Sequence, residues 1–423
     1  MKIWSKVASA VVSVGLIGGL LAGCSSNSSG TATKKNSEGS VSGKIPSGQT
    51  LTIWSWDGKP KIDILKKTAA DWAKKYGNTV KVIDQSGNSN GFQFYATSAR
   101  TGKGPDIVFG MPHDNNGQFT QQGLIEPLPK GLINPEDYTK SEIDAVTVNG
   151  KIYSAPVSAE TTALFYNTDK VKTAPKNWDE FVQAANQSGF GFEFTNLYYN
   201  YAFIGGLGGY VFKNNNGTLD PKDIGLANEG AVQAYSLLRD MNAKYKWMTA
   251  DVTDAIAKAQ FTTGKIGMYI SGPWGVPDIK KSGVKYAIAP LPTLSNGQPA
   301  TPFMGLKTAF VNARSPQNLR AAEWSLLKAI TDATMQEELF KTSQAIPTLT
   351  KLQKDSVIQN DPNIKPFADQ IKTAVPMPNI PQMQAVWGAM SVMKNIVSGK
   401  VSPEQGAKDF ENNVKKGIQV QGS

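Results

Sequence analysis

Beyond the N-terminal region, short apolar runs alternate with stretches of helical periodicity, and this alternation restricts the fold more than any other feature of the sequence. The run 51–56 has the β-branched and aromatic content of a strand, and apolar residues from Ile62 to Tyr76 then recur every three to four positions. Further strands are predicted at 80–83 and 106–109, with a polar helical stretch between them. Such alternation predicts an α/β fold with a largely parallel sheet.

The second half of the chain is dominated by helical patterns. Helices are predicted near 179–187, 228–244, 251–263, 317–330, 333–343, 382–398 and 403–416, and strands near 150–156, 163–167, 265–271, 286–291 and 308–312. In open parallel sheets, ligands bind at the carboxyl ends of strands. The loops that follow Trp56, Phe109 and Ile270 are therefore the expected ligand-binding positions.

The composition is that of a globular protein and does not favour nucleic acid as a partner. The chain has 423 residues, of which 40% are hydrophobic, so two domains of about 100–200 residues are expected. The formal net charge is +10, but only four of the 44 basic residues are arginines, and nucleic-acid recognition leans on arginine. We therefore interpret the lysines as a solvated surface.

A single cysteine and a single histidine exclude several kinds of site. Cys24 has no partner for an intrachain disulfide, and together with His113 it cannot build a usual zinc site. A serine triad would have to use His113, yet the chain contains no G-x-S-x-G motif. No cofactor, metal or catalytic residue is therefore predicted.

The N-terminus predicts export. Lys2 and Lys6 precede an apolar, small-residue run over 7–23, which is typical of a signal peptide and short for a membrane span of about 20 residues. A single-pass anchor is the alternative. The run ends in Leu-Ala-Gly-Cys, which resembles the lipobox of bacterial lipoproteins and implies cleavage before Cys24 and acylation of its thiol. Residues 24–48 are rich in Ser, Gly, Asn, Thr and Lys and are interpreted as a flexible tether.

Each of the three candidate loops combines an aromatic or methionine side chain with hydrogen-bonding groups. They are 56–59, 111–116 and 272–274. Sugars present an apolar C–H face and a rim of hydroxyls, so this combination favours a sugar site. Carboxylates serve well there because charged acceptors form the stronger hydrogen bonds. For any single Trp or Asp, core packing or helix capping is the alternative.

Several longer motifs carry a family resemblance. They are 104–109 followed by His113-Asp114, 149–153, 166–169, 270–274, the stretch 209–225 and the run Met377–Met383. With these motifs the chain, from about residue 50 onward, resembles the maltose/maltodextrin-binding proteins of ABC importers, which belong to the family 1 extracellular solute-binding proteins. The run Met377–Met383 and the stretch 209–225 are the narrower motifs and point to the maltodextrin branch.

The resemblance implies a type II periplasmic-binding-protein-like fold with two α/β lobes and a ligand cleft between them. The hinge would have three segments, near 158–160, 303–306 and 345–348. The implied division of the chain is a signal peptide at 1–23, a tether at 24–48, an N-terminal lobe at 49–158 plus 306–347, and a C-terminal lobe at 159–305 plus 348–423.

The loops and the resemblance together define the candidate sugar-binding residues. They are Asp57, Lys59, Met111, Asp114, Asn115, Glu160, Asn196, Tyr198, Trp274 and Trp387. Some positions depart from the family pattern: Met111 stands where a Trp is common, Asn115 where an Arg is common and Asn196 where a carboxylate is common. Gly388 and Ser391 replace larger polar residues. These departures predict a roomier site.

The implied function is capture of maltose or maltodextrins by hinge closure, with delivery to an ABC permease. The protein would be a monomer, lipid-anchored at the extracellular face of the membrane, and not an enzyme. ATP hydrolysis would fall to a separate subunit, because the chain has no G-x-x-x-x-G-K-[ST] motif. The alternatives are a receptor for another oligosaccharide, either cyclodextrin or a xylan- or galactan-derived chain, and a lipid-anchored glycoside hydrolase that would pair Asp114 with Glu160 or Asp57.

Overall fold

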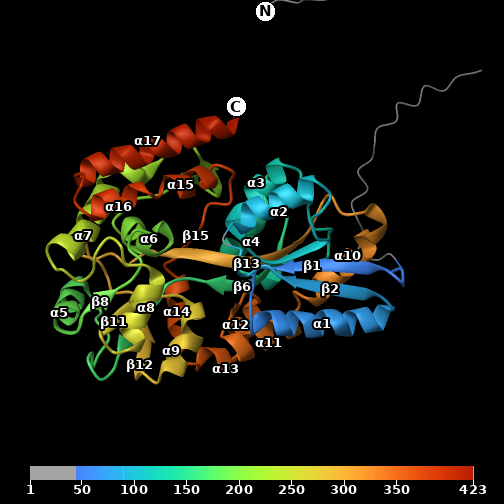
Figure 1. The fold of residues 1–423 in the computed structure, drawn as a ribbon, viewed down its shortest axis with the longest axis horizontal. Helices are drawn as coiled ribbons and strands as arrows, with labels where there is room; N and C mark the ends of the chain where they lie inside the picture. The colour runs from blue at the N-terminus through green and yellow to red at the C-terminus, as the bar shows by residue number, and fades with distance from the viewer. Residues whose placement is uncertain (1–43, 89, 423) are drawn as a thin grey trace, which may run out of the picture. The chain divides into compact units, whose positions relative to one another are not determined.

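A computed structural model of the protein describes residues 44–88 and 90–422, so the predicted signal peptide and Cys24 lie outside the described residues. A first sheet has the strand order β14-β6-β13-β3-β1-β2, and β15 pairs with β13 (Figure 1). Its strands are β1 (Thr50–Ser55), β2 (Thr79–Asp84), β3 (Ile107–Pro112), β6 (Ala155–Glu160), β13 (Phe303–Val311), β14 (Ile346–Pro347) and β15 (Val375–Pro376).

The first sheet is mixed, so the prediction of a largely parallel sheet is wrong. Strand β1 runs parallel to β2 and β3. Strand β13 is antiparallel to both β3 and β6, and β14 is antiparallel to β6. The reason is that β13 returns from the second half of the chain in the opposite direction and inserts between two strands of the first half. It begins at Phe303, five residues before the predicted start.

Helices cover both faces of the first sheet. Along β3, Ile107 and Phe109 pack into one core with α1, α10 and α11, whereas Val108 packs into a second core with α2 and α3, as the alternation of a strand requires. Helix α1 buries its apolar stripe and ends at Gly77, whose φ of 66° is the left-handed conformation that glycine adopts readily. The helices are α1 (Lys61–Tyr76), α2 (Gly91–Arg100), α3 (Asn116–Gln121), α10 (Arg320–Ala329) and α11 (Ala333–Ser343).

A second sheet has the order β12-β7-β11-β8 and is also mixed, because β11 is parallel to β8 and antiparallel to β7. Its strands are β7 (Ala163–Asn167), β8 (Phe190–Gly191), β11 (Met268–Ser271) and β12 (Tyr286–Ala289). The helices of this part are α5 (Trp178–Ser188), α6 (Leu197–Gly206), α7 (Glu229–Ala243), α8 (Asp254–Thr262), α9 (Val276–Ser282), α14 (Lys365–Ile371), α15 (Met383–Ala389), α16 (Val392–Val397) and α17 (Pro403–Gly422).

The chain passes from one sheet to the other between β6 and β7, between β12 and β13, and between β14 and α14, a helix that packs on β7 and β12. The end of β6 and the start of β13 therefore lie where the chain leaves one sheet for the other. Figure 1 shows β6 and β13 side by side at this position. Side chains at these strand ends can contact elements from both parts.

Shorter elements complete the described chain. They are α4 (Lys140–Val146), α12 (Thr350–Gln353), α13 (Ser356–Gln359), the pair β4 (Thr147–Val148) and β5 (Lys151–Ile152), the pair β9 (Lys213–Asn215) and β10 (Thr218–Asp220), and 3₁₀ turns at His113–Asn115, Pro135–Asp137, Gly225–Ala227, Pro273–Gly275 and Gln317–Leu319.

The helix predicted near 382–398 is instead two helices, α15 and α16. The Met390 N–H bonds to the Trp387 carbonyl, three residues back instead of four, so the chain tightens there and the α-helix ends. Among the described residues, no helix combines the length and the apolar character needed to cross a membrane.

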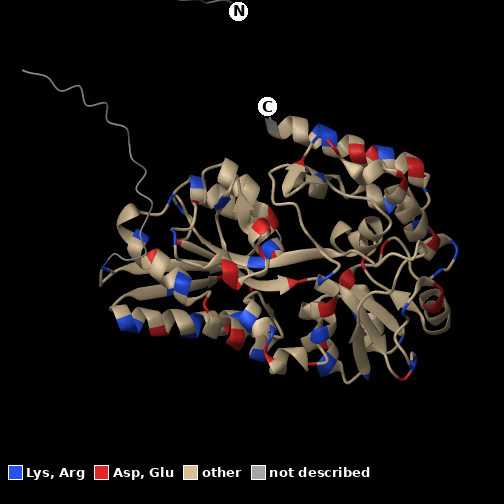
Figure 2. Ribbon diagram, turned by 180° about the vertical axis from the view of Figure 1, so that it is seen from behind, with Lys and Arg blue, Asp and Glu red and all other residues tan. Residues whose placement is uncertain are grey.

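Charged side chains of both signs are interspersed on the surface. In the view of Figure 2, basic and acidic segments alternate along α1 and α17. Several lysines pair with acids one helical turn away, as in Lys67–Asp71 and Lys415–Glu411. Exposed pairs of this kind contribute little stability, so they describe a solvated surface.

Candidate functional site

A buried group of charges lies where the first strand and the crossing strands meet. Asp57 follows β1, and its Oδ1 lies 3.2 Å from Lys61 Nζ. Glu160 ends β6, with Oε1 4.0 Å from Lys61 Nζ and Oε2 3.9 Å from Lys307 Nζ on β13. Burial opposes protonation of Lys61, but the carboxylates of Asp57 and Glu160 outweigh it and raise the pKa of this ammonium group. We call these four residues the charge cluster.

Lys61, and not the predicted Lys59, lies in the charge cluster. The Lys59 side chain is 75% exposed and pairs with Asp63 at 2.8 Å, away from the charge cluster. The Lys61 side chain is only 18% exposed and lies between two carboxylates. The physical reason is the start of α1 at Lys61, which turns this side chain inward and leaves Lys59 in the preceding loop, facing solvent.

Asp114 and Trp387 join the two parts of the protein directly. Asp114 lies in the turn after β3, is buried, and its Oδ2 accepts a hydrogen bond from Trp387 Nε1 at 2.9 Å. Its Oδ1 accepts from Asn115 Nδ2 at 3.3 Å. Burial raises the pKa of Asp114, and the neighbouring His113 and the Trp387 N–H only partly offset this effect. The carboxylate is thus held by an indole from a helix 273 residues later in the chain.

His113, next to Asp114, ties the turn to the crossing segments. The Leu306 N–H donates to His113 Nδ1 at 3.0 Å, so the ring proton is on Nε2, which donates to the Met377 carbonyl at 3.0 Å. Burial lowers the pKa of His113, and the attraction of Asp114 does not restore it. The ring is therefore neutral and fully paired.

We expect the free energy of unfolding to fall as the pH drops below about 6.5, the ordinary pKa of a histidine. In that range the unfolded chain binds a proton at His113 that the folded chain does not bind, so acid favours unfolding. The slope from this group is at most about 1.4 kcal/mol per pH unit. Asp114 has the opposite effect on the free energy of unfolding, because its raised pKa lets the folded state take up a proton at a higher pH than the unfolded chain does.

Urea titrations from pH 5 to 7 of the protein and of His113→Gln measure this contribution. The glutamine can donate and accept in place of the imidazole but cannot titrate. The free energy of unfolding of the variant should depend less steeply on pH than that of the parent protein. Equal slopes for the two proteins would mean that other groups cause the pH dependence.

An aromatic wall faces the charge cluster from the second part of the protein. Trp274 is 37% exposed, and its ring centroid lies 6.0 Å from that of Tyr198 and 6.3 Å from that of Tyr199. A Cβ at Gly272 would lie 2.0 Å from the Trp274 ring, so only glycine lets this ring fold back over its own turn. Phe303, at the start of β13, lies 6.4 Å from Tyr198 between centroids and completes the wall.

The charge cluster and the aromatic wall each contain one buried polar side-chain atom that has no hydrogen-bond partner among the described residues. These atoms are Asp57 Oδ2 and the Tyr198 hydroxyl oxygen. Burial, with the nearby Glu160 carboxylate, raises the pKa of Tyr198, so its hydroxyl keeps its proton. Buried polar groups normally have partners, and an unpaired acceptor and an unpaired hydroxyl suit a ligand that carries hydroxyls.

Three further predicted site residues make contacts within the protein. Met111 is 2% exposed and packs in the core beneath α2, because on β3 its side chain points to the α2 face. The Asn196 Oδ1 accepts from the Tyr198 N–H at 3.0 Å and caps α6. Asn115 donates to the Pro112 carbonyl at 3.0 Å, although its Oδ1 also lies 3.5 Å from Gln384 Nε2.

Three residues of the charge cluster and the aromatic wall were not predicted from the sequence: Lys61, Lys307 and Phe303. Lys61 had a local signal, since it stands four residues after Asp57. Lys307 is the one charge in the apolar strand Phe303–Val311, a pattern that marks a buried or functional cation. Phe303 had no local signal, because its role depends on the crossing between sheets.

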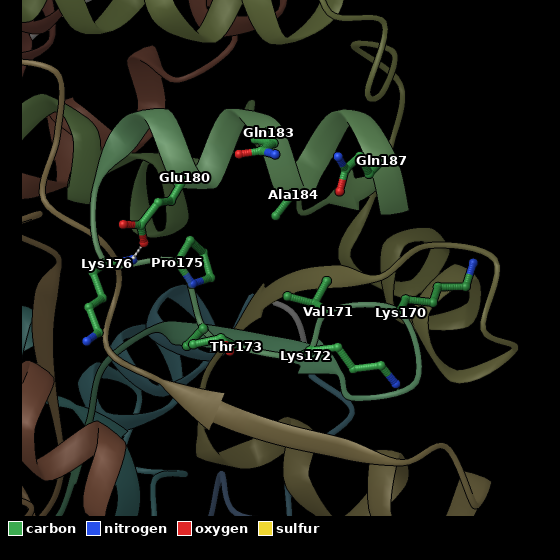
Figure 3. Close-up of a pocket in the computed structure, with 11 residues that line it drawn as sticks. Lys170, Val171, Lys172, Thr173, Pro175, Lys176, Glu180, Gln183, Ala184 and Gln187 are labelled. Atoms are coloured by element: carbon green, nitrogen blue, oxygen red, sulfur yellow. Dashed lines mark hydrogen bonds between the residues drawn. The ribbon is translucent and has the colours of Figure 1, made fainter.

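A separate surface hollow does not belong to this site. It measures about 520 Å³ and lies between α5 and the loop before it, with Lys170, Lys172 and Lys176 in its lining (Figure 3). Lys170 and Lys172 donate to the carbonyls of Lys265 and Thr168. The hollow shares no residue with the charge cluster or the aromatic wall. In the part of the chain that the structure describes, no group of three or more His, Cys, Asp or Glu side chains could hold a metal ion.

Comparisons with known proteins identify the family and the fold. The family model described as bacterial extracellular solute-binding protein matches residues 67–366. The solved maltose-maltodextrin binding protein of the thermoacidophilic bacterium Alicyclobacillus acidocaldarius is 56% identical, with a TM-score of 0.84 over 87% of this chain and 100% of that chain.

Two curated relatives are similar over most of their length. The galactooligosaccharide-binding protein of Bacillus subtilis is 30% identical over 85% of this chain and 87% of its own. The maltooligosaccharide ABC transporter solute-binding lipoprotein of Streptococcus pneumoniae is 30% identical over 94% of each.

The match covers most of the described residues, and the fold agrees with that of the solved relative, so the predicted periplasmic-binding-protein-like α/β fold is confirmed. The family is non-catalytic, which confirms that the protein is not an enzyme and removes the glycoside hydrolase alternative. The chain belongs to the bacterial extracellular solute-binding proteins.

Proposed function

We propose that this protein captures maltodextrins outside the cell and delivers them to an ABC permease with a separate ATPase. The observation that carries the proposal is a site that contains both unpaired buried polar atoms, at Asp57 and Tyr198, and aromatic rings, with Trp274 beside Tyr198 and Trp387 bonded to Asp114. Sugars need both kinds of contact. The 56% identity to a maltose-maltodextrin binding protein supports glucose polymers as the sugar class.

Capture would use closure of two lobes about the crossing segments, with 49–158 plus 306–347 in one lobe and 159–305 plus 348–423 in the other. Asp57, Lys61 and Asp114 belong to the first lobe, and Trp274 and Trp387 to the second. A sugar held by one lobe gains contacts with the other only on closure, so binding favours the closed state. A shift from 1:99 to 99:1 needs about 5.5 kcal/mol of differential affinity. Several hydroxyl hydrogen bonds of about 0.5–1.5 kcal/mol each, with two stacked faces, are sufficient.

We further propose that the mature protein is a monomer that begins at Cys24 and is held at the extracellular face of the membrane by acyl chains on that residue. The lipoprotein relative of Streptococcus pneumoniae supports this anchor and the ABC transporter context. Mass spectrometry of the protein extracted from membranes tests the anchor. A Cys24→Ser variant should be recovered without acylation.

Isothermal titration of the fragment from Lys44 to the C-terminus with glucose, maltose, maltotriose, maltotetraose and a cyclodextrin tests the proposed sugar class. Saturable binding that strengthens from maltose to the longer linear sugars is expected. A folded protein that binds none of the five would contradict the maltodextrin proposal.

A second candidate ligand is a galactooligosaccharide, favoured by the 30% identical relative of Bacillus subtilis. The same titration with galactobiose and galactotetraose separates the two classes. The higher identity of the maltodextrin relative favours tighter binding of glucans.

Replacement of Trp274 by alanine should weaken maltotriose binding at least tenfold. The ring offers an exposed stacking face, and a stacked aromatic pair adds about 0.5–1.5 kcal/mol beyond the area that it buries. Titration of the variant measures the loss, and its thermal unfolding midpoint should stay close to that of the parent. An unchanged affinity would assign Trp274 to packing against Tyr198 and Tyr199.

A further inference from the structure

A second hollow, of about 480 Å³, lies between α15 and α17, which pack along each other (Figure 1). We call it the Gly388 hollow. Its lining combines small residues with amide and ammonium side chains, among them Ala385, Gly388 and Gly417, and Gln384, Asn413 and Lys416.

Two glycines determine the shape of the Gly388 hollow. At Gly417 a Cβ would lie 2.8 Å from the Cβ of Ala385, so the two helices touch there. At Gly388, one helical turn further along α15, a Cβ would meet nothing within 4 Å. The hollow is therefore open at residue 388, where a larger side chain would occupy it.

Helix α15 connects the Gly388 hollow with the proposed sugar site. Gln384 lines the hollow, and its Nε2 also lies 3.5 Å from Oδ1 of Asn115, the residue that contacts Asp114. Trp387, which donates to Asp114, directly precedes Gly388. Trp387 and the lining residue Gly388 are thus neighbours on α15, and a sugar chain that stacks on Trp387 and extends along this helix would reach the hollow.

We propose that the Gly388 hollow is an additional saccharide subsite, which holds the glucose units of long maltodextrins that extend past Trp387; this inference rests on the proposed function. The amide groups of Gln384 and Asn413 each donate and accept hydrogen bonds, as sugar hydroxyls do, and Lys416 adds a donor. The lining has no carboxylate. A volume of this size falls within the range of about 300–1,000 Å³ for ligand pockets.

The variant Gly388→Phe tests the inference, because its ring would fill the hollow and exclude a sugar unit. A Cβ at this position meets no atom within 4 Å, so the ring can be accommodated. Residue 388 lies within a helix, where glycine is among the poorest residues, so the variant is expected to fold. Titration should show maltotriose binding unchanged within twofold and maltoheptaose binding weakened at least fivefold. The matched control Gly388→Ala adds one methyl group and should change neither affinity. Asn413→Ala, which leaves the space open, should weaken maltoheptaose alone.

Each other outcome overturns the inference. Equal losses for maltotriose and maltoheptaose would mean that residue 388 acts through the position of Trp387. An unchanged affinity for both sugars would mean that the hollow holds no sugar. If the parent protein binds neither sugar, the proposed function itself fails, and the parent titration distinguishes this case from a failure of the subsite alone.

Discussion

Lys61→Met is expected to lower the free energy of unfolding by about 3 kcal/mol. Lys61 lies 3.2 Å from Asp57 and 4.0 Å from Glu160, and all three side chains are mostly buried. Methionine keeps the length of the side chain but removes the ammonium group, so two carboxylates remain desolvated and Asp57 loses its cation. Lys307, 3.9 Å from Glu160, compensates only one of them. Urea denaturation at pH 7 measures the change.

Lys59→Met is the matched control, because it makes the same chemical change two residues away. The ammonium group of Lys59 is exposed and pairs with the half-exposed Asp63, so its removal should change the free energy of unfolding by no more than about 0.5 kcal/mol. Similar losses for the two variants would contradict the assignment of Lys61, and not Lys59, to the charge cluster.

Asp114→Ala is expected to weaken maltotriose binding about a hundredfold. The carboxylate is the buried acceptor between the two parts of the protein, and hydrogen bonds to charged groups contribute about 1.5–3 kcal/mol each. Alanine also leaves the Trp387 N–H without its acceptor, so the stacking face loses its anchor. Titration with maltotriose measures the loss. Asp114→Asn keeps an oxygen that can accept from Trp387, so its affinity for maltotriose should lie between those of the parent protein and Asp114→Ala.

The affinity of the parent protein should also fall on acidification. Burial raises the pKa of Asp114, so its carboxylate is protonated at a higher pH than the ordinary value of 3.8, and the neutral acid is the weaker acceptor. An Asp114→Ala protein that binds maltotriose as tightly as the parent would remove Asp114 from the site.

Several parts of the fold could be predicted because their signals are local. The apolar stripe from Ile62 to Tyr76 predicted α1, and the helix is found at Lys61–Tyr76. The longer motifs predicted the family, which the comparisons confirm. The prediction of a largely parallel sheet was wrong, because β13 inserts between β3 and β6 in the antiparallel direction. The periodicity of a segment contains no information about which strands will lie next to it.

The site was only partly predictable for the same reason. Asp57, Asp114 and Trp387 were found from loops and motifs, and the structure brings each into contact with a site residue. Met111 lies on β3 and Asp114 in the turn after it, yet Met111 packs into the same core as Val108, because Gly110, with a φ of 81°, interrupts the alternation of β3 where its register with β13 shifts.

The chain's local patterns therefore determined its class, the strands and helices, the candidate export signal and the family, because each depends on residues that are close in sequence. Tertiary structure alone decided which lysine faces the carboxylates, which apolar residues form the aromatic wall and where space is left at Gly388. The Asp114–Trp387 hydrogen bond joins residues 273 positions apart, and the His113–Leu306 bond joins residues 193 apart. Such contacts form only when the strands that cross between the two sheets bring distant segments together.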